Sequence, residues 1–245
     1  RRTRREPVDT QTRHALKKDS FVQATQSSVG WISGHKSGVV RWAIIVVVIL
    51  VAVVGALVFR NAREAAADSA LGAAMDTYSG PLAQPGAPPE TGVYSNAADR
   101  SKAANKQFLA VADQYGWLPE GMKAHYFAGI TSQEMGQTAA AETELKKVAD
   151  SWSWGGRNLS NLAKLALAGI YHQTNRDAQA IEIYNGLAAK PSETVSASVA
   201  KLDLADLYAA TGKQDQARKL WAEVKDSDKA GAAGSIAAQK LGPKQ

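Results

Sequence analysis

An uninterrupted apolar run is the feature that most constrains how this chain can fold. The eighteen residues from Trp42 to Phe59 include no charged side chain, and Arg41 and Arg60 flank them. As an α-helix the run would be about 27 Å long, close to the roughly 30 Å hydrocarbon core of a bilayer. Aromatic side chains at the ends and arginines just outside suit the two membrane interfaces. The sequence therefore predicts one transmembrane helix at residues 42–59, anchored by these four residues.

Two other interpretations of the run fit less well. A buried core helix or strand is rarely so long and so uniformly apolar. A cleaved signal peptide has a shorter apolar region near the N-terminus, whereas this run follows about forty residues and lacks a convincing cleavage site. We therefore expect a permanent anchor in a lipid bilayer.

The distribution of charge separates the chain at the end of the run. Residues 1–59 contain the whole net charge of +6, and residues 60–245 contain equal numbers of basic and acidic side chains. Clustered cations bind nucleic acid by releasing counterions from phosphate, and a neutral domain argues against that partner. The basic tail is expected to serve topology or to contact anionic head groups. Cysteine is absent, so disulfides and thiolate metal sites are excluded.

Orientation rests on a small charge bias. Basic residues within about 15 to 20 positions of the run nearly balance, so the cytoplasmic placement of the N-terminus depends on Arg13, Lys17 and Lys18. We expect residues 1–19 to be a disordered cytoplasmic tail. Residues 20–41 are expected to include a short juxtamembrane helix, which lies on the inner leaflet or acts as a soluble tether.

Beyond the run, a self-similar spacing predicts a helical repeat. Gly136, Asn175 and Gly212 suit the left-handed turn that ends a helix. Around each turn residue, small residues lie seven positions before and five after, and larger ones mostly lie four before and nine after. The three sets are Gly129, Ser132, Ala141 and Leu145; Ala168, Tyr171, Ala180 and Tyr184; and Ala205, Tyr208, Ala217 and Trp221. We expect the small residues where helices cross closely and the large ones between hairpins.

This pattern resembles the tetratricopeptide repeat. The second and third sets match it best, and the first is degenerate because Ser132 and Leu145 replace aromatic residues. An earlier unit is split, with Leu71 and Met75 separated from Ala104 and Phe108 by an inserted Pro/Gly-rich loop at residues 80–99. A helix from about residue 61 is expected to continue the span, and one at 229–241 to cover the last hairpin. The predicted fold is therefore all-α: one transmembrane helix followed by a tetratricopeptide-like helical-hairpin array at residues 60–245.

The basic tail, single span and exported repeats together resemble the ancillary subunit of the bacterial Sec translocon, and so does the sequence at residues 12–21. This resemblance implies a link between a translocation channel and periplasmic chaperones or clients. The leading hypothesis is a protein-binding scaffold or accessory subunit of an envelope machine, single-pass in a bacterial inner membrane, with a cytoplasmic N-terminus and periplasmic repeats. The alternative is a structural accessory subunit of a large respiratory or photosynthetic membrane complex, held mainly through its span.

No pattern of residues predicts an enzyme. The four histidines are not spaced as metal ligands, and no nucleophile-elbow, zincin or phosphate-loop motif occurs. Two acidic pairs, Glu142 with Glu144 and Asp203 with Asp206, are expected on solvated helix faces. We predict no catalytic residue, no metal, no cofactor and no small-molecule substrate.

The predicted binding face lies on the inner helices of the hairpins. Tetratricopeptide domains that hold a peptide C-terminus do so with Lys and Asn side chains, which are missing from these positions. The candidate protein-binding residues are Tyr126, Ile130, Gln133, Leu165, His172, Leu202 and Asp206. Either an apolar or amphipathic partner segment or the chain's own C-terminal helix could occupy this face. Trp117, Trp152 and Trp154 are expected to pack hairpin junctions rather than to bind a partner.

Overall fold

The computed structural model describes residues 36–84, 92–151 and 156–242, and the expected tail and juxtamembrane helix at residues 1–33 lie outside them. The described residues form helices, with one isolated β-bridge between Leu82 and Tyr94. The chain divides into two compact units, residues 1–61 and residues 62–245. This confirms the all-α fold, and the two units are described separately below.

Helix α2 (Lys36–Tyr78) contains the apolar run. The large apolar side chains of the run are exposed, from Trp42 at 70 % to Phe59 at 59 %. Each such Val, Ile or Leu side chain left in water forgoes about 1.5–3 kcal/mol of burial, so transfer of this surface to an apolar environment is favourable. Among the described residues, α2 is the helix long and apolar enough to cross a membrane. It continues beyond the expected span because residues 60–78 are rich in alanine, a strong helix former.

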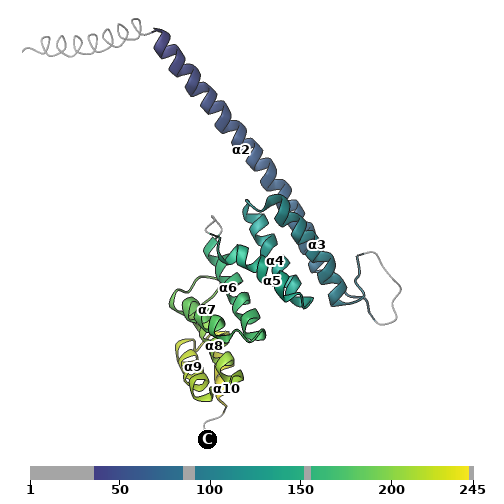
Figure 1. The fold of residues 1–245 in the computed structure, drawn as a ribbon, viewed down its shortest axis with the longest axis vertical. Helices are drawn as coiled ribbons and strands as arrows, with labels where there is room; N and C mark the ends of the chain where they lie inside the picture. Colours follow the sequence, from purple (N-terminus) through teal and green to yellow (C-terminus); the bar gives the residue numbers. More distant parts are fainter. Residues whose placement is uncertain (1–35, 85–91, 152–155, 243–245) are drawn as a thin grey trace, which may run out of the picture. The chain divides into compact units, whose positions relative to one another are not determined.

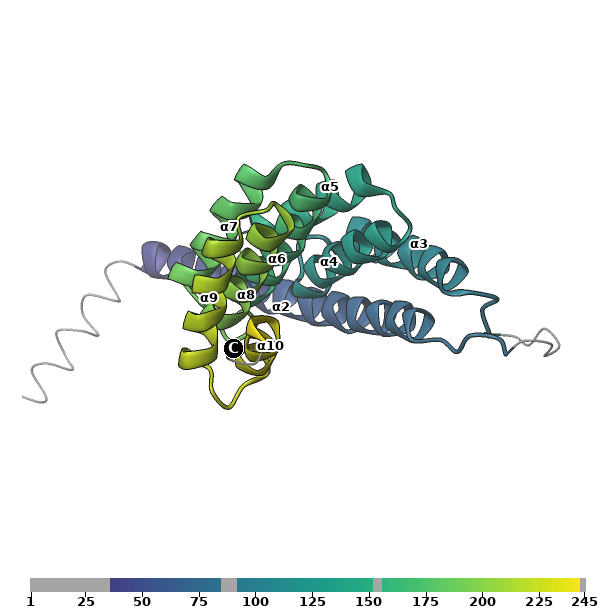
Figure 2. The same ribbon diagram turned by 90° about the horizontal axis from the view of Figure 1, so that it is seen from below.

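The second unit is a succession of antiparallel hairpins, shown from two directions in Figures 1 and 2. Its helices after α2 are α3 (Ala97–Tyr115), α4 (Pro119–Glu134), α5 (Thr138–Ala149), α6 (Gly156–Gln173), α7 (Asp177–Ala189), α8 (Ala197–Ala210), α9 (Gln214–Ser227) and α10 (Ala232–Leu241). From α3 to α10, each helix packs against the next one in sequence. The predicted hairpin array is confirmed.

The three predicted turn residues all adopt the left-handed conformation. Gly136, Asn175 and Gly212 have φ angles of 72°, 57° and 77°, and Asn175 is the non-glycine residue with a positive φ in the described part of the chain. In each turn the N–H of the following residue donates to the carbonyl four positions before the turn residue, at 2.8, 2.7 and 2.8 Å respectively. This bond closes the helix end in the manner of a Schellman motif. The repeat register is therefore confirmed at all three turns.

The small residues of the repeat lie where helices approach closely. Ala168 and Ala205 are completely buried, as are the three alanines at positions 141, 180 and 217. A Cβ atom added to Gly129 would lie 2.6 Å from Cγ of Leu145, too close for any real contact. Leu145 itself has no exposed surface, so this crossing of α4 and α5 needs a glycine.

The first hairpin pairs the end of α2 with α3 through a core that includes Leu71, Ala74, Ala104 and Phe108. The inserted loop ends earlier than the expected boundary at residue 99, because α3 begins at Ala97. Asn96 caps this helix: its side-chain oxygen accepts a hydrogen bond from the N–H of Asp99 at 2.9 Å. The Pro/Gly-rich composition extended the predicted loop over residues that the cap makes helical.

Helix α10 covers the last hairpin, as the sequence predicted. Ala233 and Ala237 are buried in one cluster with Leu202, Ala205 and Trp221. Figure 2 shows α10 beside α8 and α9, the two helices that it contacts. Helix α10 therefore covers apolar side chains of both α8 and α9.

Candidate functional site

The candidate binding residues on α4 and α6 are half-buried. Tyr126 and Ile130 pack against the core shared by α5 and α6, and Leu165 packs on two neighbouring clusters. The imidazole Nδ1 of His172 lies 2.6 Å from the carboxylate of Asp177. Gln133 is also half-buried. These five residues come from the inner helices, as expected, and their contact with a partner stays a prediction.

The two candidates on α8 are engaged by α10. Leu202 is only 7 % exposed and packs with that helix. Asp206 accepts hydrogen bonds from Nε1 of Trp221 at 3.0 Å and from Nζ of Lys240 at 2.7 Å. At this end of the array the chain's own C-terminal helix occupies the face, which is the second of the two alternatives drawn from the sequence.

The acidic pairs are not simple solvated faces. Glu144 is buried, and its carboxylate lies 2.6 Å from Nδ1 of His125 and 2.9 Å from Nζ of Lys147. Burial and the neighbouring Asp206 raise the pKa of Asp203 to about 6. The expectation of solvation was wrong for these residues because periodicity alone does not show which helix covers which face.

Glu142 belongs to a network that ties α5 to the α6–α7 turn. Arg176 donates to both carboxylate oxygens, at 3.1 and 2.6 Å, and Lys146 lies 2.6 Å from the same carboxylate. Hydrogen bonds from Arg176 and then Lys146 lower the pKa of Glu142 to about 2. The Arg176 guanidinium also lies 4.4 Å from the ring centroid of Tyr171. This arrangement is typical of an ion pair that fixes neighbouring hairpins, rather than of an acid and base pair.

Trp117 does not pack a hairpin junction, as was expected of it. Its side chain is 61 % exposed, although Leu118 beside it is buried. The expectation was wrong at this position, and the other two tryptophans lie outside the described residues.

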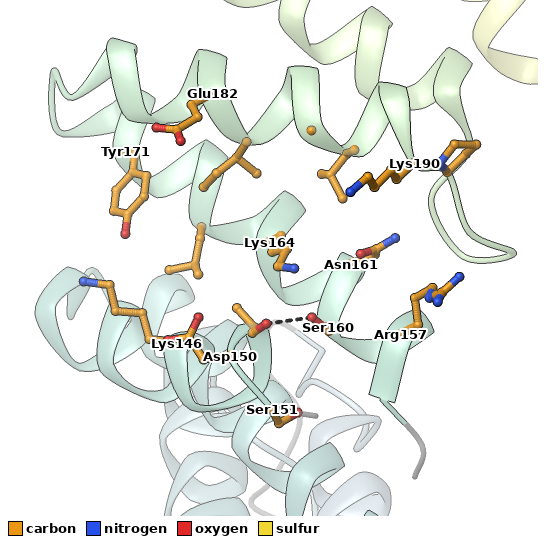
Figure 3. A pocket seen from close by; sticks show the side chains of 16 residues that line it. Lys146, Asp150, Ser151, Arg157, Ser160, Asn161, Lys164, Tyr171, Glu182 and Lys190 are labelled. Carbon is orange, nitrogen blue, oxygen red and sulfur yellow. Dashed lines mark hydrogen bonds between the residues drawn. The ribbon is translucent and has the colours of Figure 1, made fainter. Parts of the chain in front are cut away.

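Sequence reasoning missed a groove bounded by α5, α6 and α7 (Figure 3). Its volume is about 1170 Å³. The floor is a stripe of α6 in which Arg157, Asn161, Lys164 and Leu167 recur every three or four positions, so they share one helix face. The hydroxyl of Ser160 donates to the carbonyl of Ala149 at 2.7 Å and holds α6 to α5 beneath the groove. The spacing of basic residues on α6 was the signal that could have revealed this site.

The charges of the groove are unevenly matched. Lys146 is held by Glu142, and the acidic side chains that line the groove are Asp150 and Glu182. In the described part of the chain, Arg157, Lys164 and Lys190 form no ion pair. Figure 3 shows Arg157, Asn161 and Lys190 toward one end, with Lys164 near the middle. Three unmatched cations therefore surround one part of the groove.

The hairpins, their left-handed turns and the covering helix α10 define a tetratricopeptide-type repeat protein. The family described as tetratricopeptide repeat-like domain matches residues 38–242, and the chain belongs to this family. Such repeats typically serve as protein-interaction scaffolds, and no enzymatic family is indicated. No curated protein and no solved structure matches the chain. In the described residues no three His, Cys, Asp or Glu side chains are grouped as metal ligands.

Proposed function

We propose that this chain is a membrane-anchored scaffold whose hairpin repeats bind other proteins. The observation that carries the proposal is the combination of a compact repeat unit at residues 62–245 with an uncovered apolar stretch of α2 in the same chain. A bilayer accounts for the exposed apolar surface. A repeat stack presents extended surfaces suited to segments of other proteins.

The finer proposal is an accessory subunit of an envelope machine in a bacterial inner membrane, associated with the Sec translocon. It is supported by the basic tail, the single span and the resemblance to the ancillary translocon subunit. The open inner-face residues on α4 and α6, with Tyr126 and Ile130 as the largest apolar ones, are the proposed contacts for a partner. The N-terminus is proposed to be cytoplasmic and the repeats periplasmic.

Replacement of the span tests the scaffold against the alternative of a subunit held through its transmembrane helix. Residues 42–59 are exchanged for a polyleucine helix of equal length in the full chain, and co-purified proteins are compared with those of the wild type. A scaffold keeps its partners, because the repeats are unchanged. Loss of every partner with the foreign span, at normal protein levels, would favour the respiratory or photosynthetic alternative and contradict the proposal.

The proposed orientation has its own test. A reporter that is active only in the periplasm, fused after Gln245, is expected to be active in cells. A silent periplasmic reporter together with an active cytoplasmic one would reverse the topology and remove the translocon analogy.

A further inference from the structure

The groove between α5, α6 and α7 contains a polar side chain that is free to bind a ligand. Asn161 is only 7 % exposed, and its amide forms no hydrogen bond within the described residues. In Figure 3 this amide points into the groove. The amide itself is open to solvent, so a ligand in the groove can form hydrogen bonds with it without breaking one to the protein.

The cations around this amide come from two helices. Arg157 and Lys164 lie four residues before and three after Asn161, so α6 presents all three on one face. Lys190, at the end of α7, lies on the facing side of the groove. Lys164 is half-buried, and its ammonium has no carboxylate partner in the described part of the chain. An anionic group bound here would meet positive charge from both sides.

The groove is not purely polar. Ile183, which is half-buried, lines it together with the buried Leu167 and Leu187. A ligand that matches both the cations and the apolar lining of the groove combines carboxylates with apolar side chains. Asp150 and Glu182 also line the groove and disfavour a continuous polyanion such as nucleic acid. The chain's own N-terminal tail is excluded as the occupant by its basic charge.

We propose that this groove binds an acidic segment of a partner protein, with carboxylates at Arg157, Lys164 and Lys190 and an apolar side chain on Ile183. This inference rests on the proposed scaffold function and names the chemistry of one class of partner. The Asn161 amide donates to a backbone carbonyl or a carboxylate of the bound segment. The site lies on α6 between α5 and α7, and its lining does not include the inner-face candidates Leu165 and His172 of the same helix.

The test measures binding of short fluorescent peptides to the full chain in nanodiscs of zwitterionic lipid. One peptide alternates Glu with Leu, and its matched control has Gln at every Glu. The acidic peptide is expected to bind at least about tenfold more tightly than the Gln peptide, with affinity falling as salt rises. Equal affinity for the two peptides would overturn the proposal.

Charge reversal then locates the site. The triple variant Arg157→Glu, Lys164→Glu and Lys190→Glu is expected to weaken binding of the acidic peptide by about tenfold or more. The matched control reverses three exposed lysines on other helices, Lys102→Glu, Lys106→Glu and Lys219→Glu, and is expected to stay within about twofold of the wild type. Similar losses in both triples would show a general charge effect and contradict the groove.

Two further measurements guard against misfolding and against a lipid ligand. Lys164→Gln and Asn161→Ala are milder changes than the triple charge reversal. Each is expected to weaken binding of the acidic peptide by about threefold and to leave the thermal melting temperature unchanged. If neither variant changes the affinity, the proposal is wrong. Vesicles of phosphatidylglycerol test for a lipid ligand. If the wild type binds the vesicles but not the acidic peptide, and the groove triple variant no longer binds the vesicles, the groove contacts a membrane and the proposal is wrong.

The partners of the full chain separate this inference from the scaffold proposal. If the groove triple recovers every partner of the wild type, the groove inference fails and the scaffold stands. If neither the wild type nor the chain with the polyleucine span recovers a partner, the scaffold proposal itself fails.

Discussion

Ser132 in the first half of the array and Tyr171 in the second half occupy the same repeat position, four residues before a turn, but different interactions fill the two sites. Nδ2 of the Asn105 amide on α3 lies 3.0 Å from the Ser132 hydroxyl, 2.9 Å from that of Thr131 and 2.9 Å from the carbonyl of Ala128. At the equivalent place, the ring of Tyr171 is buried with Ala168 and Leu204. One crossing is closed by hydrogen bonds, the other by an aromatic ring.

The difference shows what the repeat requires. All three sites keep a small residue at the close crossing and a left-handed turn, so these features determine the path of the backbone. The residue beside the turn only has to fill space without leaving a buried polar atom unpaired. In the degenerate repeat, one complete set of contacts therefore replaces another.

The largest expected effect concerns what the two halves share. Ala168→Leu and Ala205→Leu each add volume to a fully buried crossing and should destabilise the protein by about 1–3 kcal/mol. Thermal melting of the full chain in detergent measures this loss. Ala178→Leu, at an exposed position on α7, is the matched control and should melt like the wild type. Unchanged melting of both buried variants would contradict the register.

The next effect is specific to the first half. Asn105→Ala removes the amide from buried Thr131 and Ser132 and should cost about 1–2 kcal/mol. The double variant Asn105→Ala with Ser132→Ala should lose less stability than the sum of the losses of the two single variants. Once Asn105 is absent, removal of Ser132 also removes the hydroxyl that would be left unpaired. In contrast, Tyr208→Phe in the second half should change stability by less than about 0.5 kcal/mol. Denaturant titration compares the four variants, and strict additivity would disprove the shared network.

A smaller effect concerns Asp203, a partly buried carboxyl in the second half. The pKa of Asp203, raised from 3.8 to about 6 chiefly by burial, means that the folded state retains a proton that the unfolded state releases. The stability that protonated Asp203 contributes is therefore complete below about pH 4 and is lost as the pH rises through 6. Asp203→Asn should stabilise the protein by about 1 kcal/mol at pH 7.5, after allowance for solvent screening, and by almost nothing at pH 4. An equal gain at both pH values would reject this explanation.

The smallest effect concerns the ion pair between α10 and α8. Lys240→Ala removes the exposed contact with Asp206 and should cost less than about 1 kcal/mol, with the difference vanishing in high salt. Lys229→Ala, an exposed lysine without a carboxylate partner in the described part of the chain, should have no measurable effect. A loss above 2 kcal/mol for Lys240→Ala would show that α10 depends on this contact more than on Ala233 and Ala237.

Much of the fold could be predicted from the sequence because its determinants are local. The turns at Gly136, Asn175 and Gly212 need a left-handed residue, and Ala168 and Ala205 repeat at fixed distances from them. The Asn96 cap was missed, since the prolines and glycines before it dominated the composition of the loop. Burial of Glu144 and Asp203 depends on which helices meet, and no single-helix period contains that information.

The candidate site was less predictable. The inner-face positions followed from the register, but the cover that α10 places over Leu202 and Asp206 depends on tertiary packing. The groove is formed by three consecutive helices, but its cations are ordinary surface residues until the packing of α5 and α7 against α6 encloses them. Only the alignment of Arg157, Asn161 and Lys164 on α6 is visible in the sequence.

Helix α10 also determines how the molecule can associate with copies of itself. An open hairpin stack ends in an apolar face onto which the first hairpin of another molecule could add, and repetition of that head-to-tail contact would produce a filament. Ala233 and Ala237 occupy this face from within the chain, and the lysine at position 240 places a charge at its edge. This end of the described array therefore does not offer the apolar face of α8 and α9 that a head-to-tail contact would need.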